Sequence, residues 1–139
     1  MSIKTLFTIS ILAFIICLMG SCAKVATGPT FTWSYATYNT ADSAFSPATN
    51  PAADEILAYT SMQIVRIQLS NTMTVGNHNL SSTGSGSFLY LYYSGVNLYS
   101  QSGTLNIAAN NGTSMSGSFS ATLSDGTGIS GSFSDIPIR

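Results

Sequence analysis

The chain has 139 residues, the length of about one domain, and it carries very little charge. Four basic and five acidic side chains make 6% of the residues charged, against about 25% in ordinary soluble domains. So few basic groups exclude a phosphate-neutralising surface, and we expect no nucleic-acid partner. A 45% apolar share excludes a charge-rich disordered tail. With one His and two Cys, the sequence predicts no metal site and no cofactor.

The first residues have the order of a secretory signal peptide, which we place at residues 1–21. Lys4 precedes an apolar run over residues 6–19, and two small residues precede Cys22. That run is shorter than the roughly 20 residues that a membrane-spanning helix needs. Because Cys17 would leave with the signal peptide, we expect a mature protein without a disulfide.

The sequence Leu18-Met19-Gly20-Ser21-Cys22 resembles a bacterial lipobox. The resemblance implies that Cys22 receives acyl chains, and several chains together make membrane attachment effectively permanent. Ala23 at the next position is similar to an outer-membrane sorting signal, and no acidic surface-export cluster follows. We therefore expect a lipoprotein of the bacterial outer membrane, with the periplasmic face favoured over the cell surface. Residues 22–30 would form the lipidated tether, and 31–139 a single β domain.

Beyond the tether, alternation of apolar and polar residues predicts β-strands, most clearly over 31–35 and 63–69. Residues 39–53 contain two prolines and predict a loop. Residues 54–59 fit either one helical turn or the start of a strand. Residues 88–93 are apolar at both parities, which predicts a strand covered on both faces or an aromatic outer face.

The last third of the chain gives the clearest pattern. Asn111-Gly112 between two alternating runs predicts a hairpin with a type I′ turn. Residues 115–120 and 129–134 share the pattern apolar-Ser-Gly-Ser-Phe-Ser, which predicts two paired antiparallel strands. Gly117 and Gly131 lie on the core parity, so each is expected either to leave room for a bulky neighbour or to allow a bend. The whole pattern predicts an all-β fold, an antiparallel sandwich of about six to eight short strands; a small closed antiparallel barrel is the alternative.

Three motifs of this region also suggest a family resemblance. They are the G-x-L-x-I pattern that begins at Gly103, the S-G-x-F-S pattern at Ser116 and the terminal G-x-F pattern at Gly131. Together with the lipobox, they resemble small lipoproteins of unknown function that are common in Bacteroidetes. The resemblance implies a β-rich domain and brings no activity with it.

Few residues offer chemistry. His78 is the only side chain that would titrate near neutrality, and no nucleophile-elbow motif accompanies it; we interpret it as an exposed turn histidine and predict no catalytic residue. The segment 125–128 offers one carboxylate, and turn chemistry accounts for it without a metal. Asp42-Ser43-Ala44 resembles the O-glycosylation acceptor of Bacteroidetes, which makes Ser43 a candidate acceptor in an exposed loop.

Aromatic residues are enriched, and two interpretations stay open. They either fill a core poor in Leu or form an exposed binding face. The candidate face consists of Trp33, Tyr35, Tyr90, Tyr92, Tyr93 and Tyr99.

We expect a non-enzymatic, lipid-anchored envelope protein with a binding or structural role, accessory to a larger outer-membrane assembly. A glycan-binding module is the alternative and a hydrolase the third hypothesis. A coplanar exposed row of aromatic rings favours glycan, whereas an unpaired flat edge strand favours a protein partner.

Overall fold

A computed structural model describes residues 28–47, 54–70, 72–82 and 86–139. The predicted signal peptide and Cys22 lie outside these residues. Within them the protein is built from β-strands, and they include no helix long and apolar enough to span a bilayer. The strands are β1 (Thr30–Tyr35), β2 (Thr37–Thr40), β3 (Ser43–Phe45), β4 (Asp54–Tyr59), β5 (Gln63–Leu69), β6 (Gly76–Leu80), β7 (Phe88–Tyr93), β8 (Val96–Asn110), β9 (Ser114–Leu123) and β10 (Gly128–Pro137).

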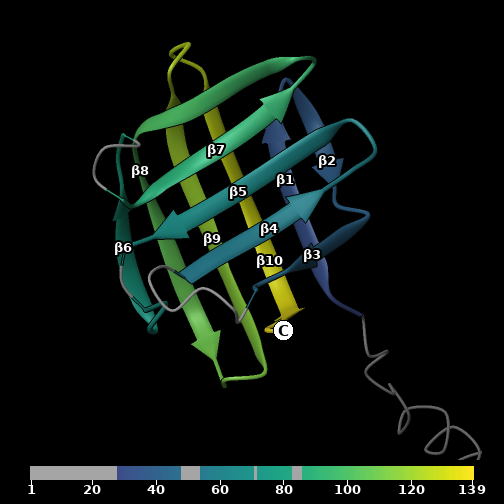
Figure 1. Cartoon of the computed structure of the whole chain (residues 1–139), viewed down its shortest axis with the longest axis vertical. Helices are drawn as coiled ribbons and strands as arrows, with labels where there is room; N and C mark the ends of the chain where they lie inside the picture. The colour runs from purple at the N-terminus through teal and green to yellow at the C-terminus, as the bar shows by residue number, and fades with distance from the viewer. Residues whose placement is uncertain (1–27, 48–53, 71, 83–85) are drawn as a thin grey trace, which may run out of the picture.

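All strands belong to one sheet with the order β2-β1-β10-β9-β8-β7-β5-β4-β3, and β6 pairs with β8. Every pair of neighbouring strands is antiparallel, so the predicted all-β antiparallel fold is confirmed. The sheet curls into a half-barrel in which β4, β5 and β7 cross in front of β1, β9 and β10 (Figure 1). The two layers of the predicted sandwich are therefore two halves of one curled sheet. We call β3, β4, β5, β7 and the start of β8 the front layer, and the others the back layer.

β8 belongs to both layers. Its first residues, from Val96, pair with β7, and its later residues pair with β6 on one side and β9 on the other. The register against β9 shifts between Ser100 and Ser102 and again between Ile107 and Ala109. Such bulges bend a strand and increase its twist, which lets β8 pass from one layer to the other. At the first bulge the buried Ser100 hydroxyl accepts a hydrogen bond from Leu89 N (2.9 Å) and donates one to the carbonyl of Ser81 (2.6 Å).

The sheet does not close into the alternative barrel, because its terminal strands β2 and β3 are not paired with each other in the described residues. Instead, a parallel bridge joins Ser46, just after β3, to Ile138, just after β10. Ser46 N donates to the carbonyl of Pro137 (2.8 Å), and Arg139 N donates to the carbonyl of Ser46 (2.9 Å). The last residues thus tie the front layer to the back layer at one corner.

The core lies between the layers, and the glycines of β9 and β10 shape it. The two segments pair as antiparallel strands, as the sequence predicted, and their register places Gly131 opposite Phe119 and Gly117 opposite Phe133. A Cβ on Gly131 would lie 2.5 Å from Phe119 Cζ, and one on Gly117 2.7 Å from Phe133 Cζ. Each glycine therefore leaves space that the aromatic ring of the opposite strand fills. The ring of Phe31 stacks on both phenylalanines, with centroids 5.5 and 5.8 Å away.

Several local predictions need correction. Residues 39–53 are not a single loop, because they include the end of β2 and all of β3; residues 54–59 form strand β4. The described residues form ten strands rather than six to eight. β2, β3 and β6 are short, and β2 and β6 are mostly polar. All three gain order by pairing with a longer strand, which alternation within their own sequence does not reveal. The hairpin at Asn111-Gly112 is present, but Gly112 alone there has a positive φ (84°), so the turn is not type I′.

Candidate binding face

Aromatic and aliphatic side chains gather on the outward side of the front layer. Cross-strand register places them in two rows that run across the strands, because directly opposed residues share one face of a sheet. We call this surface the aromatic face. One row contains Tyr59, Ile64, Tyr92 and Asn97, and the other Leu57, Arg66, Tyr90 and Tyr99.

The aromatic face is open to solvent at its centre and at both ends of the rows. Tyr59 is 39% exposed, Ile64 38% and Tyr99 37%, and the tyrosines of β7 are half-buried. The rings are inclined to one another: Tyr90 and Tyr99 lie 5.3 Å apart at 49°, and Phe88 lies 6.3 Å from Tyr99 at 58°. The surface is thus apolar and uneven, and its rings do not form a flat platform.

Arg66, the one charged residue in the two rows, is neutralised by the neighbouring Glu55 of β4. Arg66 Nε lies 2.5 Å from Glu55 Oε1, and Arg66 Nη2 donates to Glu55 Oε2 at 3.3 Å. The Tyr90 hydroxyl donates to Asn97 Oδ1 at 2.8 Å. Burial raises the pKa of the Tyr90 phenol, and the neighbouring phenols of Tyr99 and Tyr92 raise it further. The face therefore presents neutral tyrosines around a closed ion pair.

Trp33 is not part of any exposed face, so its assignment to the predicted binding face is wrong. Its side chain is fully buried, and its Nε1 donates to Gln63 Oε1 at 3.1 Å. Gln63 Nε2 in turn donates to Asn39 Oδ1 at 3.2 Å, so that three strands of both layers share one chain of hydrogen bonds. Trp33 shares its parity with Phe31, and the other parity of β1 carries Thr32 and Ser34, which directs the aromatic side inward.

Tyr35 and Tyr93 lie apart from the aromatic face. Their rings form an edge-to-face pair with centroids 5.2 Å apart, and both pack against the core. The Tyr35 hydroxyl donates to Asp125 Oδ2 at 2.9 Å. Burial raises the pKa of Tyr35, with a further contribution from Asp125, whereas the pKa of Asp125 is lowered first by the hydrogen bond from Thr127 N. The hydrogen bond between Tyr35 and Asp125 connects β1 to the β9–β10 turn. The tyrosines of the predicted binding face therefore form two separate groups, Tyr35 with Tyr93 and Tyr90 with Tyr92 and Tyr99.

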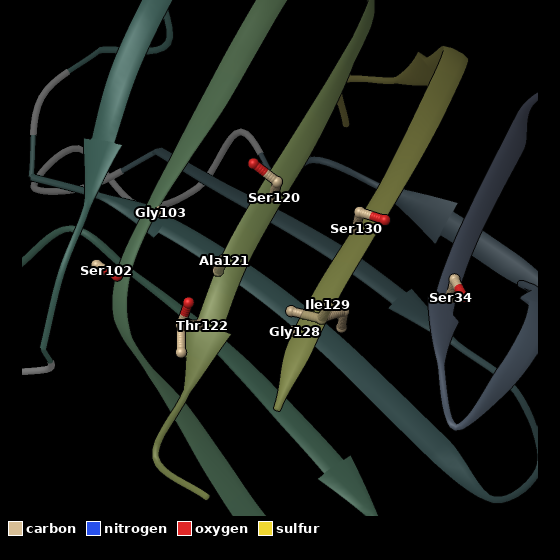
Figure 2. A pocket seen from close by; sticks show the side chains of 9 residues that line it. All are labelled: Ser34, Ser102, Gly103, Ser120, Ala121, Thr122, Gly128, Ile129 and Ser130. Atoms are coloured by element: carbon tan, nitrogen blue, oxygen red, sulfur yellow. The ribbon is translucent and has the colours of Figure 1, made fainter. Parts of the chain in front are cut away.

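The outward side of the back layer is its polar counterpart. Ser and Thr alternate with the core residues there, as the sequence predicted for β9 and β10. An open groove of about 470 Å³ lies on this side, and Figure 2 shows its short hydroxyl side chains on neighbouring strands. No charged residue lines it, and its members are Ser34, Ser102, Gly103, Ser120, Ala121, Thr122, Gly128, Ile129 and Ser130.

The remaining candidates take structural positions. His78 is half-buried in β6 rather than in an exposed turn, and its Nε2 lies 2.7 Å from the carbonyl oxygen of Thr74, which accepts the hydrogen bond. Asp125 Oδ1 accepts a hydrogen bond from Thr127 N (2.9 Å), the turn chemistry expected there. Ser43 is half-buried in β3 rather than in an exposed loop; its glycosylation stays a prediction. The described residues contain no cluster of three or more His, Cys, Asp or Glu side chains that could hold a metal ion.

The chain matches no family model, and neither curated proteins nor solved structures give a significant match. The candidate site therefore depends on its own geometry.

Sequence reasoning identified the tyrosines of β7 and β8 but missed their neighbours. Tyr59, Ile64 and Leu57 join them only through the pairings β4–β5 and β5–β7, which bring distant segments together. The alternation over residues 63–69 is consistent with the outward position of Arg66, and an aromatic outer face was one of the two alternatives that the apolar run at 88–93 left open. The order of the strands was the missing information.

Proposed function

We propose that this protein is a lipid-anchored, non-catalytic module of the bacterial outer membrane that binds another envelope protein through the aromatic face. The observation that carries the proposal is the pair of apolar rows on the front layer, where Ile64 lies between Tyr59 and Tyr92. Tyrosine and arginine are enriched in protein interfaces, and charged residues are depleted at their centres. The largest exposed apolar patch of a monomeric domain, typically about 300–600 Å², is often functional.

The size and charge of the aromatic face define its partner. At about 4.8 Å between strands, the rows cover roughly 20 by 15 Å, or about 300 Å². That area is well below the roughly 800 Å² that each partner buries in a standard stable interface. We therefore expect a weak contact with an uncharged, apolar segment of the partner, since Arg66 and Glu55 neutralise each other. A shared membrane anchor compensates for low affinity by raising the local concentration.

The tilt of the rings favours a protein over a glycan. A sugar platform needs several aromatic faces in one plane, but here the rings of Tyr90 and Tyr99 are inclined by 49°. The indole of Trp33, the largest aromatic side chain of the predicted platform, is buried. The aliphatic Ile64 in the middle of a row suits a protein side chain.

The lipid anchor has its own test. Cys22→Ala removes the only thiol at the lipobox, so we expect loss of metabolic acyl labelling and transfer of the protein out of the detergent phase in phase separation. Tyr38→Ala, a change at a 72% exposed tyrosine, is the control and should leave both measurements unchanged. Acyl labelling that survives Cys22→Ala would contradict the anchor.

The aromatic face is tested by site-specific photo-crosslinking in native envelopes. Benzoylphenylalanine at Tyr92 should give one defined protein adduct, whereas the same group at Tyr38, an exposed tyrosine of β2 in the back layer, should give none. Ile64→Asp places an unpaired charge in the row and should weaken the adduct by about 30-fold, the effect of losing about 2 kcal/mol at an interface hot spot.

Thr122→Asp introduces the same charge on the back layer and is the matched control. It should leave the Tyr92 adduct unchanged, and both variants should melt close to the wild type because surface changes cost little stability. Equal adducts from Tyr92 and Tyr38 would overturn the proposed face. If the adduct at Tyr92 contains no protein and is lost when oligosaccharide is added, the glycan alternative would be favoured instead.

A further inference from the structure

A second cavity lies at the corner where the two layers are tied together. It has a volume of about 260 Å³ and is formed by the start of β1, the β2–β3 connection, β3 and the last residues of the chain. This is smaller than the roughly 300–1,000 Å³ of pockets for drug-sized ligands, so its ligand must be small. We call it the corner pocket; its lining residues are Pro29, Phe31, Ala41, Asp42, Ser43, Ala44, Pro137 and Arg139.

Among its lining side chains, the corner pocket has one of each charge, and the other side chains are small or apolar. Arg139 and Asp42 both line it, yet the described residues show no ion pair between them. The guanidinium of Arg139 lies over the ring of Phe45, 4.8 Å from its centroid, which fixes the cation and leaves its N–H edges for a ligand.

Asp42 is held in place as well. Its Oδ2 accepts a hydrogen bond from Ser61 N at 3.1 Å, and a carboxylate keeps further acceptor positions beyond that one. When a cation and an anion line one pocket without pairing, a ligand that carries both charges gives each of them an oppositely charged partner. A purely anionic or purely cationic ligand would satisfy one group and be repelled by the other.

The position of the pocket suggests where such a zwitterion comes from. Pro29, in its lining, is seven residues after Cys22, a length of chain that spans at most about 25 Å. Figure 1 shows the start of β1 and the C-terminus at the same lower end of the molecule. With Cys22 acylated, this end lies next to the membrane surface, where headgroups are present at high local concentration, so even weak affinity is sufficient.

We propose that the corner pocket binds a zwitterionic phosphoethanolamine group, the headgroup of a membrane phospholipid. Arg139 binds the phosphate, because a guanidinium matches phosphate geometry, and Asp42 accepts hydrogen bonds from the ammonium group. Its membrane source rests on the proposed lipid anchor, whereas recognition of the zwitterion does not. Headgroup binding would set the orientation of the domain on the bilayer.

The soluble arm of the test uses the full-length protein in non-ionic detergent, whether or not Cys22 is acylated, and follows the amide NMR signals of Asp42, Ser43 and Ala44. Glycerophosphoethanolamine should shift them in a saturable way. Ethanolamine and glycerophosphate, which carry one charge sign each, should bind at least tenfold more weakly. Glycerophosphocholine should also bind at least tenfold more weakly, because its quaternary ammonium has no N–H to donate to Asp42.

Two variants and one control assign the contacts. Asp42→Asn keeps an acceptor for Ser61 N, and Arg139→Gln removes the cation alone; each should weaken glycerophosphoethanolamine binding at least tenfold. Asp135→Asn removes the same charge as Asp42→Asn, from an exposed residue outside the pocket, and should change binding less than twofold. Equal binding by wild type and Arg139→Gln would overturn the site.

A second arm separates the sources of the ligand. In nanodiscs, phosphatidylethanolamine should reproduce the shifts that the soluble probe gives, and phosphatidylglycerol should not. Shifts with the soluble probe but none in nanodiscs would overturn the membrane headgroup and leave a free zwitterion as the ligand. Because the soluble arm needs neither acylation nor the aromatic face, its failure is distinguishable from a failure of the proposed function.

Discussion

Replacing Trp33 by alanine is expected to destabilise the protein by about 3–5 kcal/mol, because a fully buried Trp side chain leaves a large cavity between the layers. The change also removes the donor to Gln63 Oε1 and so interrupts the hydrogen-bond chain that continues to Asn39. A loss of that size is a large fraction of the 5–15 kcal/mol by which domains are usually stable.

The measurement is urea unfolding followed by circular dichroism, since Trp33 is the only tryptophan and its fluorescence is lost in the variant. Trp33→Phe retains most of the apolar volume and should cost less, because the main loss is the hydrogen bond to Gln63, about 1 kcal/mol. Tyr38→Ala, at a 72% exposed aromatic residue, is the control and should stay within about 0.5 kcal/mol of the wild type. A Trp33→Ala variant as stable as Tyr38→Ala would show that the indole is on the surface.

The second large effect is expected from Gly131→Ala. The added Cβ would overlap the carbonyl oxygen of Thr32 on β1 and lie 2.5 Å from Phe119 Cζ. Phe119 can move only into a filled core, and the Thr32 carbonyl belongs to the backbone of a paired strand. We expect a cost of about 3 kcal/mol, the upper part of the usual range for overpacking.

Gly128→Ala is the matched control, because a Cβ there meets no atom within 4 Å. It should be neutral or stabilise the protein slightly by restricting the unfolded chain. Phe119→Ala alone should cost about 3–5 kcal/mol, and combining it with Gly131→Ala should cost less than the sum, since the ring overlap is then gone. Strict additivity in urea unfolding would refute the reciprocal packing of glycine and phenylalanine.

The strands that alternate strongly were predictable from the sequence. β9 and β10 bury one parity and expose Ser and Thr on the other, and the glycines at 117 and 131 leave room for bulky neighbours, which was one of the two roles expected for them. β5 shows the same agreement. In these segments the side-chain pattern alone determines which face is buried, so little information from elsewhere in the chain is needed.

The short strands were not predictable, since their order comes from pairing. β2 has no buried side chain, and it is held by its ladder to β1 and by the contact of Asn39 with Gln63. The length of β8 was also missed, because its Ser and Gly residues look like a break. In the structure they accommodate the first bulge and the buried Ser100 hydroxyl.

For the candidate site, the residue types were informative and their grouping was not. The alternation of β1 already indicated that Trp33 is buried, because Trp33 lies on the same parity as Phe31. Tyr35 likewise shares the inward parity of Trp33, and Tyr93 has the opposite parity to Tyr90 and Tyr92, so alternation alone already placed these two rings on the core side. The aromatic face exists only because β4 and β5 lie next to β7 in the sheet.

The passage of β8 through both layers has a consequence for how the domain opens. Its first half carries the ladder to β7 and its second half the ladders to β9 and β6. Neither layer can detach as a separate cooperative unit without breaking hydrogen bonds on that common strand, so local opening is confined to the peripheral strands β2, β3 and β6. The domain therefore has no boundary at which one layer could unfold separately. The amide protons in the ladders of β8 with β7 and β9 should exchange only through global unfolding.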